Sequence, residues 1–254
     1  MSYIDINCDL GESYGFFKIG NDKEVLKHIS SANIACGYHA GDHNVMMETI
    51  QMAKKYHVNI GAHPGFSDIF GFGRREMNVS TREIYNLTLY QMGALSAFAK
   101  AEGVKLVHVK PHGALYNMAA KSRLIADSIA QAVADFDSTL ILFGLSGSEL
   151  IQAGKAKGLN TAQEVFADRT YQPDGSLTSR NDENSMIHDM NIAAQRIIRM
   201  IREGKVATTD GTDIAITADT VCVHGDEPAA LNFITELKNA LTKENIEIRK
   251  SWLR

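Results

Sequence analysis

The sequence predicts a parallel α/β fold, and three observations support this prediction. Short apolar runs rich in β-branched residues recur without strict alternation, as expected for parallel strands buried on both faces. Amphipathic segments with helical signals lie between these runs. Polar and ionisable residues gather just after the runs, where parallel α/β proteins place their sites. Strand and helix thus alternate about seven times along the chain, a pattern that fits either a closed barrel or an open sheet.

The apolar runs predict seven strands. In chain order they are Tyr3–Cys8, Asn33–Cys36, Val58–Gly61, Leu106–Val109, Thr139–Phe143, Gln163–Phe166 and Thr220–Val223. Two connections, His63–Val79 and Ala167–Glu183, are much longer than the few residues usual for a βα loop, so we expect them to be functional loops. Within the first, Gly71–Arg75 is interpreted as a mobile, cationic loop over a site.

Several of the intervening helices have recognisable starts. Asp42 is suited to cap one helix, and Ser80 with Glu83 forms the pattern of a capping box for the next. A further helix is predicted between Ile187 and Ile201 from its apolar spacing. Pro228 is predicted at the first position of the last helix, where its missing N–H costs nothing.

Composition excludes several classes of protein. The chain has 254 residues, of which 44% are hydrophobic and 22% charged, as in an ordinary globular protein. We treat residues 1–254 as one domain, because no linker-like segment divides them. A net charge of -4 without a basic run argues against nucleic acid as a partner, and no apolar stretch approaches the ~20 residues of a membrane span. With no secretory signal and three cysteines that form no Cys-x-x-Cys pair, we expect a cytoplasmic protein with reduced thiols.

Acidic and histidine residues recur at the ends of successive predicted strands. The candidates for a catalytic set are Asp9, Glu12, His39, His63, His112 and Asp226. Each has an ordinary structural explanation, since an Asp alone is most simply a helix cap and a lone His is often a packed turn residue. Independent caps would not require these residue types at the ends of five or six strands, so the recurrence favours a shared site.

Two chemistries remain open for such a site. His and carboxylate groups on rigid strand ends are good ligands for a divalent metal, for which Asp9, His39 and His63 are the candidates. The alternative is metal-free acid–base catalysis in which Lys110 or Arg169 holds an anion. The chain has neither a His-Glu-x-x-His nor a His-x-x-His spacing, and it has no P-loop motif for ATP.

The strand-end motifs resemble those of the LamB/YcsF family, the A subunits of prokaryotic ATP-dependent 5-oxoprolinase. The resemblance extends over essentially the whole chain, in order. It rests on the segments Asp5–Glu12, Ala32–Asp42, Gly61–Phe66, Val109–Tyr116, Glu164–Arg169, Thr178–Arg180 and Val223–Asp226. The residues that follow Arg180 are more polar than the glycine-containing stretch expected for the family.

The resemblance implies a fold, an activity and partners. The expected fold is a distorted, roughly seven-stranded parallel (β/α) barrel similar to those of glycoside hydrolases and polysaccharide deacetylases. The expected reaction is hydrolysis of 5-oxo-L-proline to L-glutamate, coupled to conversion of ATP to ADP and phosphate. The expected partners are B and C subunits that resemble proteins of the allophanate-hydrolase group. ATP, with Mg²⁺, would be engaged through those partners.

Roles for individual residues follow as hypotheses from the same resemblance. Asp9 and Glu12 are the expected water activators, and the three histidines of the candidate set are proton carriers or metal ligands. The candidates for substrate binding are Asn7, Lys110, Asp168, Arg169, Arg180 and His224. Of these, the cationic Lys110, Arg169 and Arg180 are expected to bind a substrate carboxylate or phosphate. Two alternatives remain, a metal-dependent carbohydrate deacetylase or hydrolase and a non-catalytic subunit that binds a small acid.

Overall fold

Seven parallel strands form the wall of a closed barrel in a computed structural model that describes residues 2–180, 182–224 and 230–249. The barrel strands are β1 (Tyr3–Leu10), β2 (Ser31–Ala35), β3 (Asn59–His63), β4 (Leu106–Val109), β5 (Ile141–Leu145), β6 (Asn160–Phe166) and β9 (Thr220–His224). They pair in the order β1-β2-β3-β4-β5-β6-β9, and β9 pairs in parallel with β1 as well as with β6. This closure confirms the predicted distorted, seven-stranded barrel.

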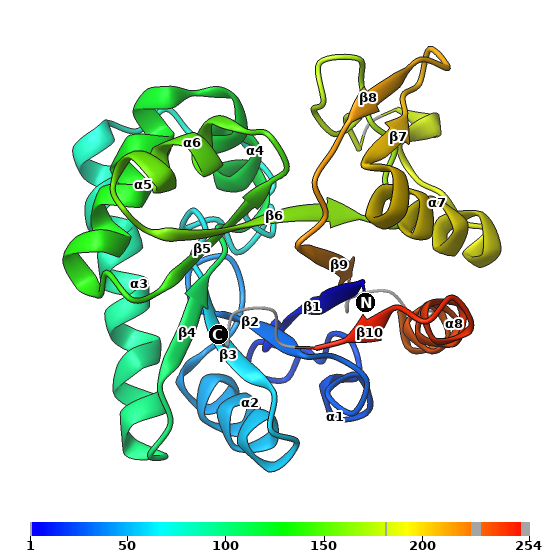
Figure 1. Ribbon diagram of the computed structural model, residues 1–254. Helices are drawn as coiled ribbons and strands as arrows, with labels where there is room; N and C mark the ends of the chain where they lie inside the picture. Colours follow the sequence, from blue (N-terminus) through cyan, green and yellow to red (C-terminus); the bar gives the residue numbers. More distant parts are fainter. Residues whose placement is uncertain (1, 181, 225–229, 250–254) are drawn as a thin grey trace.

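Helices surround this barrel (Figure 1). They are α1 (Asp22–Val25), α2 (His43–Lys55), α3 (Thr81–Ala101), α4 (Gly113–Lys121), α5 (Arg123–Phe136), α6 (Glu149–Ala156), α7 (Met190–Glu203) and α8 (Ala230–Lys243), with a short 3₁₀ turn at Glu183–Ser185. Asp42 accepts hydrogen bonds from two backbone N–H groups at the start of α2, and Ser80 and Glu83 form a complete capping box at the start of α3. Both predicted caps are confirmed. The predicted Pro228 start lies outside the described residues.

Some elements differ from the prediction. Strands β1 and β3 run two residues further than expected, so Asp9 and His63 lie within strands and not in the turns that follow. A two-stranded antiparallel sheet of β7 (Lys205–Ala207) and β8 (Asp213–Ala215) was not predicted, nor was β10 (Glu247–Ile248), which pairs with the start of β1. Pairs of two or three residues are too short to show an apolar period.

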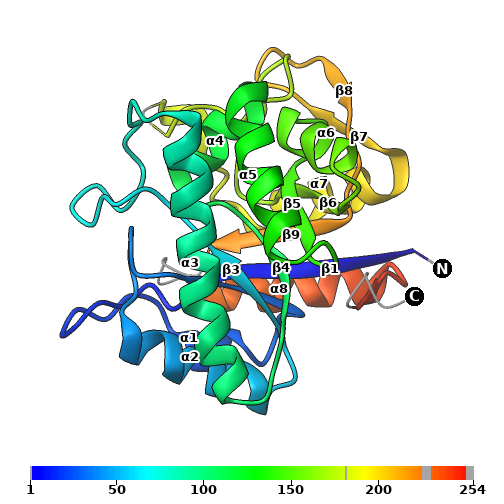
Figure 2. The same ribbon diagram turned by 90° about the vertical axis from the view of Figure 1, so that its left-hand side faces the viewer.

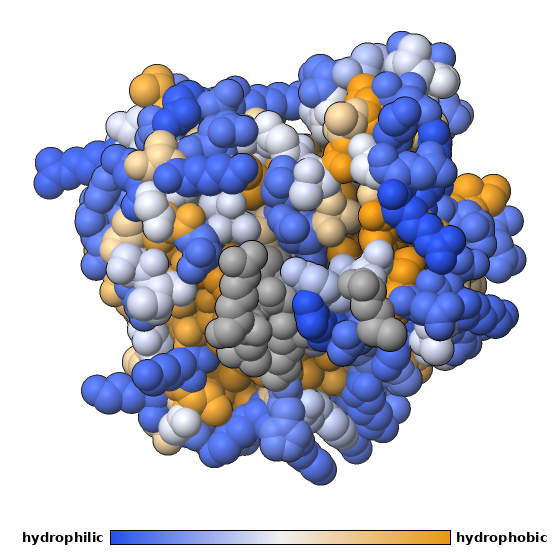
Figure 3. Space-filling view, viewed as in Figure 1, coloured by the Kyte–Doolittle hydropathy of each residue, from blue (hydrophilic) through white to orange (hydrophobic). Residues whose placement is uncertain are grey.

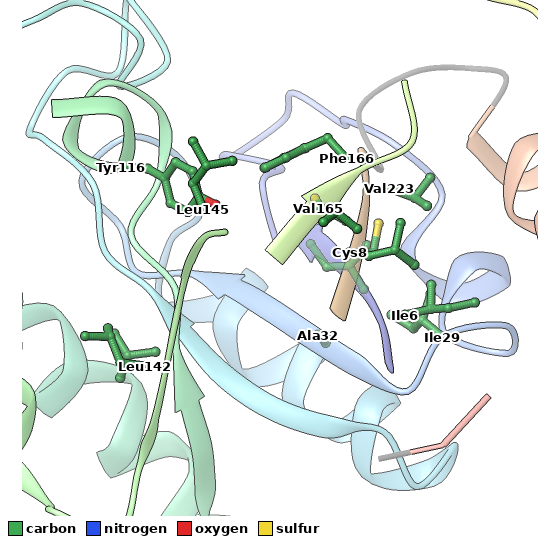
Figure 4. Close-up of a cluster of buried hydrophobic side chains, with 14 of the residues drawn as sticks. Ile6, Cys8, Ile29, Ala32, Tyr116, Leu142, Leu145, Val165, Phe166 and Val223 are labelled. Atoms are coloured by element: carbon green, nitrogen blue, oxygen red, sulfur yellow. The ribbon is translucent and has the colours of Figure 1, made fainter. Parts of the chain in front are cut away.

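Strand β1 shows how the barrel separates apolar from polar groups. Ile4, Ile6, Cys8 and Leu10 alternate with polar residues and belong to the main hydrophobic core. Figure 4 shows Ile6 and Cys8 beside Val223 of β9 and Ile29 of the segment before β2. The intervening Asp5, Asn7 and Asp9 are also buried, and their side chains bond to polar groups of other strands. On the side of β1, the interior of this barrel is therefore a polar, hydrogen-bonded layer.

The ends of the strands and the two long loops determine where a site can lie. The carboxyl ends of the barrel strands point to the left in Figure 2, and the loops after β1 and β3 extend from that end. Figure 3 shows the face that is turned to the viewer in Figure 1, which is largely hydrophilic with scattered apolar residues.

No described helix is long and apolar enough to cross a lipid bilayer.

Candidate active site

A buried lysine occupies the centre of the polar layer inside the barrel. The Nζ atom of Lys110, at the end of β4, lies 2.9 Å from Oδ1 of Asp9 and 2.9 Å from Oε1 of Glu164. It also lies 3.2 Å from Oδ1 of Asn7 and 3.0 Å from Sγ of Cys222. Burial alone would lower the pKa of Lys110, but the neighbouring carboxylates and thiol raise it well above its usual value. The group is therefore an ammonium ion, held by the carboxylates of Asp9 and Glu164.

Neutral side chains also donate hydrogen bonds to the carboxylates of Asp9 and Glu164. Asn33 donates from Nδ2 to Asn7 and to Asp9, both at 2.7 Å. The hydroxyl of Tyr116, on α4, donates to Oε2 of Glu164 at 2.7 Å. Because the groups of this network come from several strands and one helix, their positions depend on closure of the barrel. A network satisfied in this way is rigid, and it fixes the Asp9 carboxylate at the base of the site.

Three histidines lie on the loop side of this network. The rings of His39 and His112 stack with centroids 3.7 Å apart, and His63 meets both edge-on. Oε1 of Glu12 lies 3.6 Å from Nε2 of His39 and 3.7 Å from Nδ1 of His112, and Oδ2 of Asp9 lies 3.3 Å from Nε2 of His63. Burial lowers the pKa of His39 and of His112 well below the usual value. These two rings are thus neutral, which is the form in which an imidazole binds a metal.

Glycine residues allow the backbone to contact the histidines closely. A Cβ atom on Gly65 would lie 2.6 Å from Nδ1 of His39. One on Gly73, which has a φ of +63°, would lie 2.7 Å from Cβ of His39 and 2.9 Å from Cδ2 of His112. Glycine is therefore required at both positions by packing against the rings, and at Gly73 also by the left-handed backbone.

A cavity of about 870 Å³ opens from this cluster toward the loops. Its inner end is formed by residues of the polar cluster: Asp9, Glu12, His63, Lys110 and His112. Its outer wall includes the cationic residues Arg74, Lys121, Arg169 and Arg180 and the acidic residues Glu76 and Asp182. The predicted loop at 71–75 does lie over the site, but it is anchored by an ion pair between Arg75 and Asp68 and by a bond from His112 to the carbonyl of Phe72.

Comparison with known proteins assigns the chain to a family. The sequence model of the LamB/YcsF family matches residues 4–252 of this chain. The chain belongs to the LamB/YcsF family. It is 60% identical to the A subunit of 5-oxoprolinase from Oceanobacillus iheyensis over 247 residues, covering 97% of this chain and 96% of the relative. The corresponding protein of Halalkalibacterium halodurans is 56% identical over 250 residues, covering 98% of this chain and 97% of the relative.

Solved structures show the same fold. The lactam utilization protein of Thermus thermophilus superposes with a TM-score of 0.91 at 46% identity, covering 97% of this chain and 99% of that one. A family 4 carbohydrate esterase from Streptomyces lividans superposes with a TM-score of 0.52 at 10% identity, covering 97% and 91% of the two chains. The second likeness shows that the LamB/YcsF barrel shares the esterase fold, and at that identity it indicates nothing about activity.

The structure brings five of the six predicted catalytic residues of this LamB/YcsF chain together. Asp9, Glu12, His63 and His112 line the cavity, and His39 stacks on His112 beside them, so the strand-end residues lie together as the pattern predicted. Asp226 lies outside the described residues. The backbone of His224, at the end of β9, pairs in register with Asp9.

The residues predicted to bind substrate divide into two groups. Asn7 and Lys110 are part of the buried network described above. Arg180 is exposed on the outer wall of the cavity, and Asp168 is half-buried in the same loop. The buried guanidinium of Arg169 donates to the carbonyl oxygens of Thr178 and Ser185, so it braces this loop. Burial, with the nearby Arg180, lowers the pKa of Arg169 to about 10.

Sequence reasoning missed four members of the network, Asn33, Tyr116, Glu164 and Cys222. Glu164 and Cys222 lie within strands β6 and β9, and Asn33 is the first residue of a predicted strand. Cys222 is buried as predicted, but its sulfur contacts the ammonium of Lys110. A charged residue inside a predicted strand was the one available signal for Glu164, because an ionised group is rarely buried without a partner.

Proposed function

We propose that this chain is the A subunit of an ATP-dependent 5-oxoprolinase. In this proposal it opens the ring of 5-oxo-L-proline to give L-glutamate, with ATP converted to ADP and phosphate. The main support is the 60% identity, over nearly the full length of both chains, to a protein named as the A subunit of 5-oxoprolinase. The name of the Thermus relative, a lactam utilization protein, agrees with this substrate class.

The difficulty of the reaction accounts for the use of ATP. A five-membered lactam keeps its amide resonance, and the amine formed on hydrolysis can close the ring again. Phosphorylation of the amide oxygen would make the carbon electrophilic and turn that oxygen into a leaving group. The site then needs a cationic group for the carboxylate or phosphate, a base for water and an acid for the departing nitrogen.

The cavity offers groups for each of these tasks. Asp9 is the proposed base for water, since the ammonium of Lys110 at 2.9 Å stabilises its anionic form. Glu12 lies beside His39 and His112 at the same end, and His63, whose Nε2 lies 3.3 Å from Oδ2 of Asp9, is the proposed proton carrier. Arg74 and Arg180, which line the cavity, are positioned for an anionic part of the substrate or for a phosphate. Lys110 would act by organising Asp9 and Glu164.

Partners complete the proposed enzyme. The relatives are named as subunits, which implies an assembly, and we propose B and C subunits that resemble proteins of the allophanate-hydrolase group. These would engage ATP and its Mg²⁺, in keeping with the lack of a P-loop motif here. We place the complex in the cytoplasm, where ATP is available and the three free cysteines stay reduced.

The proposal is tested by reconstitution. The chain is co-expressed with the products of neighbouring genes, purified as a complex, and assayed for glutamate released from 5-oxo-L-proline with and without ATP. Glutamate release that requires both ATP and the partners is the expected result. A complex that releases no glutamate, or a chain that instead releases acetate from acetylated sugars in a chelator-sensitive manner, would refute it.

A further inference from the structure

The outer nitrogens of two histidines in the site have fixed protons. Nδ1 of His63 lies 2.7 Å from the backbone carbonyl oxygen of Lys110, and Nε2 of His112 lies 2.8 Å from that of Phe72. A carbonyl oxygen only accepts hydrogen bonds, so each of these nitrogens must carry hydrogen. A neutral imidazole has a single N–H. The inner nitrogens, Nε2 of His63 and Nδ1 of His112, are therefore both lone-pair acceptors when the rings are neutral.

These two lone pairs face one another at short range. The inner nitrogens are 3.0 Å apart, which is hydrogen-bond distance, although neither has a proton to donate in the neutral rings. Oε1 of Glu12 lies 3.7 Å from Nδ1 of His112, and it adds a third acceptor. One candidate ligand atom from each of Glu12, His39, His63 and His112 lies within 4.8 Å of the others. Acceptors converging in this way need a positive centre between them.

A shared proton and a metal ion are the two positive centres that fit. A shared proton would join only two atoms, the inner nitrogens 3.0 Å apart, and would leave Oε1 of Glu12, 3.7 Å from Nδ1 of His112, outside the bond. A metal ion requires neutral imidazoles, and histidine ligands usually donate their other N–H to a backbone carbonyl or carboxylate. His63 and His112 both do so, to Lys110 and to Phe72. The hydrogen-bonding pattern is thus the one expected around a metal.

We propose that Nε2 of His63, Nδ1 of His112 and the carboxylate of Glu12 bind a divalent transition-metal ion. Two imidazoles and a carboxylate form a ligand set suited to zinc and its neighbours. With metal–ligand bonds of about 2.0–2.2 Å, tetrahedral ligand atoms lie roughly 3.3–3.6 Å apart. The distances of 3.0 and 3.7 Å within the set bracket this spacing.

His39 has a different place in the proposed site. Its ring is parallel to that of His112 within 3°, so its Nε2 cannot share an ion with His112 in the plane of both rings. Neither of its ring nitrogens has a hydrogen-bond partner among the described residues, although the side chain is fully buried. The remaining coordination position is thus left to water or substrate beside His39. A metal at this position would polarise that oxygen, which is a task that the proposed hydrolysis requires.

Metal binding is tested on the purified full-length chain, independently of any assay of 5-oxoproline. The protein is incubated with Zn²⁺ or Co²⁺, desalted and analysed for metal content, and the Co²⁺ form is examined for visible d–d absorption. We expect about one ion per chain, and a Co²⁺ spectrum typical of nitrogen and oxygen ligands. His63→Ala and His112→Ala should each weaken binding by at least about tenfold, and Glu12→Gln should also weaken it.

A matched control distinguishes metal binding at this site from nonspecific binding by surface histidines. His43→Ala removes an exposed imidazole at the start of α2 and should leave metal content and spectrum unchanged. Circular dichroism establishes whether each variant is folded, and the wild-type metal content tests the proposal even if a variant is not. The site is refuted if folded wild-type protein retains neither ion. It is equally refuted if a folded His63→Ala/His112→Ala double variant retains the ion with the same spectrum.

Discussion

The carboxylates of Asp9 and Glu164 share one ammonium ion, that of Lys110, and only Asp9 also faces the histidines. Asp9 is 8% exposed and lines the cavity, whereas Glu164 is fully buried and is not among the lining residues. Their roles should differ accordingly. Asp9 can reach a water molecule in the cavity, and Glu164 holds Lys110 and Tyr116 in place.

The Asp9→Asn variant tests this difference through catalysis. The substitution keeps the shape of the side chain but removes the charge that a base requires. In the reconstituted complex, turnover should fall by about a hundredfold or more. Asp127→Asn, which removes a carboxylate paired with Arg123 on α5, is the matched control and should have normal turnover. Nearly normal glutamate release by Asp9→Asn would remove this residue from the mechanism.

Asp5 makes stability depend on pH. Its carboxylate lies inside the barrel and accepts hydrogen bonds from the hydroxyls of Ser30, Ser31 and Thr220 at 2.7, 2.8 and 2.5 Å. Burial raises its pKa in spite of these bonds. An acid with a raised pKa in the folded state binds protons more tightly there than in the unfolded chain. Its contribution to stability is therefore complete below the usual pKa of about 4 and is lost as pH rises through the folded-state value.

The Asp5→Asn variant should remove this dependence. Free energies of unfolding are measured by urea denaturation of both proteins at a series of pH values from acid to neutral. The advantage of wild type over Asp5→Asn should shrink steadily as the pH rises, because the other titrating groups are common to both proteins. A difference that stays constant with pH would show that Asp5 has the same pKa in the folded and unfolded states.

At the scale of single helices, two glycines allow a matched test of packing. Gly93 lies within α3, and no atom lies within 4 Å of the position that a Cβ would take. Gly154 lies within α6, where a Cβ would be 2.7 Å from Cγ2 of Thr161 and 3.1 Å from Cδ2 of Leu142. Gly93→Ala should therefore raise the free energy of unfolding by about 0.5–1 kcal/mol. Gly154→Ala should lower it by about 1–3 kcal/mol.

Chemical denaturation of the two variants and wild type measures these changes directly. Both positions lie outside the cavity, so metal content and turnover should stay at the wild-type level. If the two substitutions shift stability in the same direction, helix propensity or packing against β5 and β6 has been assigned incorrectly.

Elements whose signals are local could be predicted from the sequence. The caps at Asp42 and Ser80 are confirmed because a cap depends on residues two or three positions away. The predicted ends of the strands were less accurate. The pairing of β1 with β2 continues through Asp9 and Asn33, although polar residues normally end an apolar run. The β7–β8 pair could not be predicted, since three-residue strands carry no period.

At the scale of the whole molecule, the candidate active site could be predicted from the sequence only in part. The parallel order of strands was sufficient to bring Asp9, His39, His63 and His112 to one end of the barrel. The partners of Lys110 were not predictable, because Glu164 reaches Asn7, a residue 157 positions away, only after β9 closes the barrel between β6 and β1. The sequence prediction placed Lys110 on an anion of the substrate, and the structure adds ion pairs with Asp9 and Glu164. A long-range ion pair of this kind leaves no local pattern.

The division of labour within the proposed complex gives the last prediction. The chain alone has a cavity with acid, imidazole and cationic groups, but its sequence lacks a P-loop motif. The purified single chain should therefore release neither phosphate from ATP nor glutamate from 5-oxo-L-proline at a useful rate. Both products are measured under identical conditions for the single chain, the partners alone and the complex, and only the complex should form them together. Robust glutamate release by the single chain would show that this barrel activates the lactam without the partners.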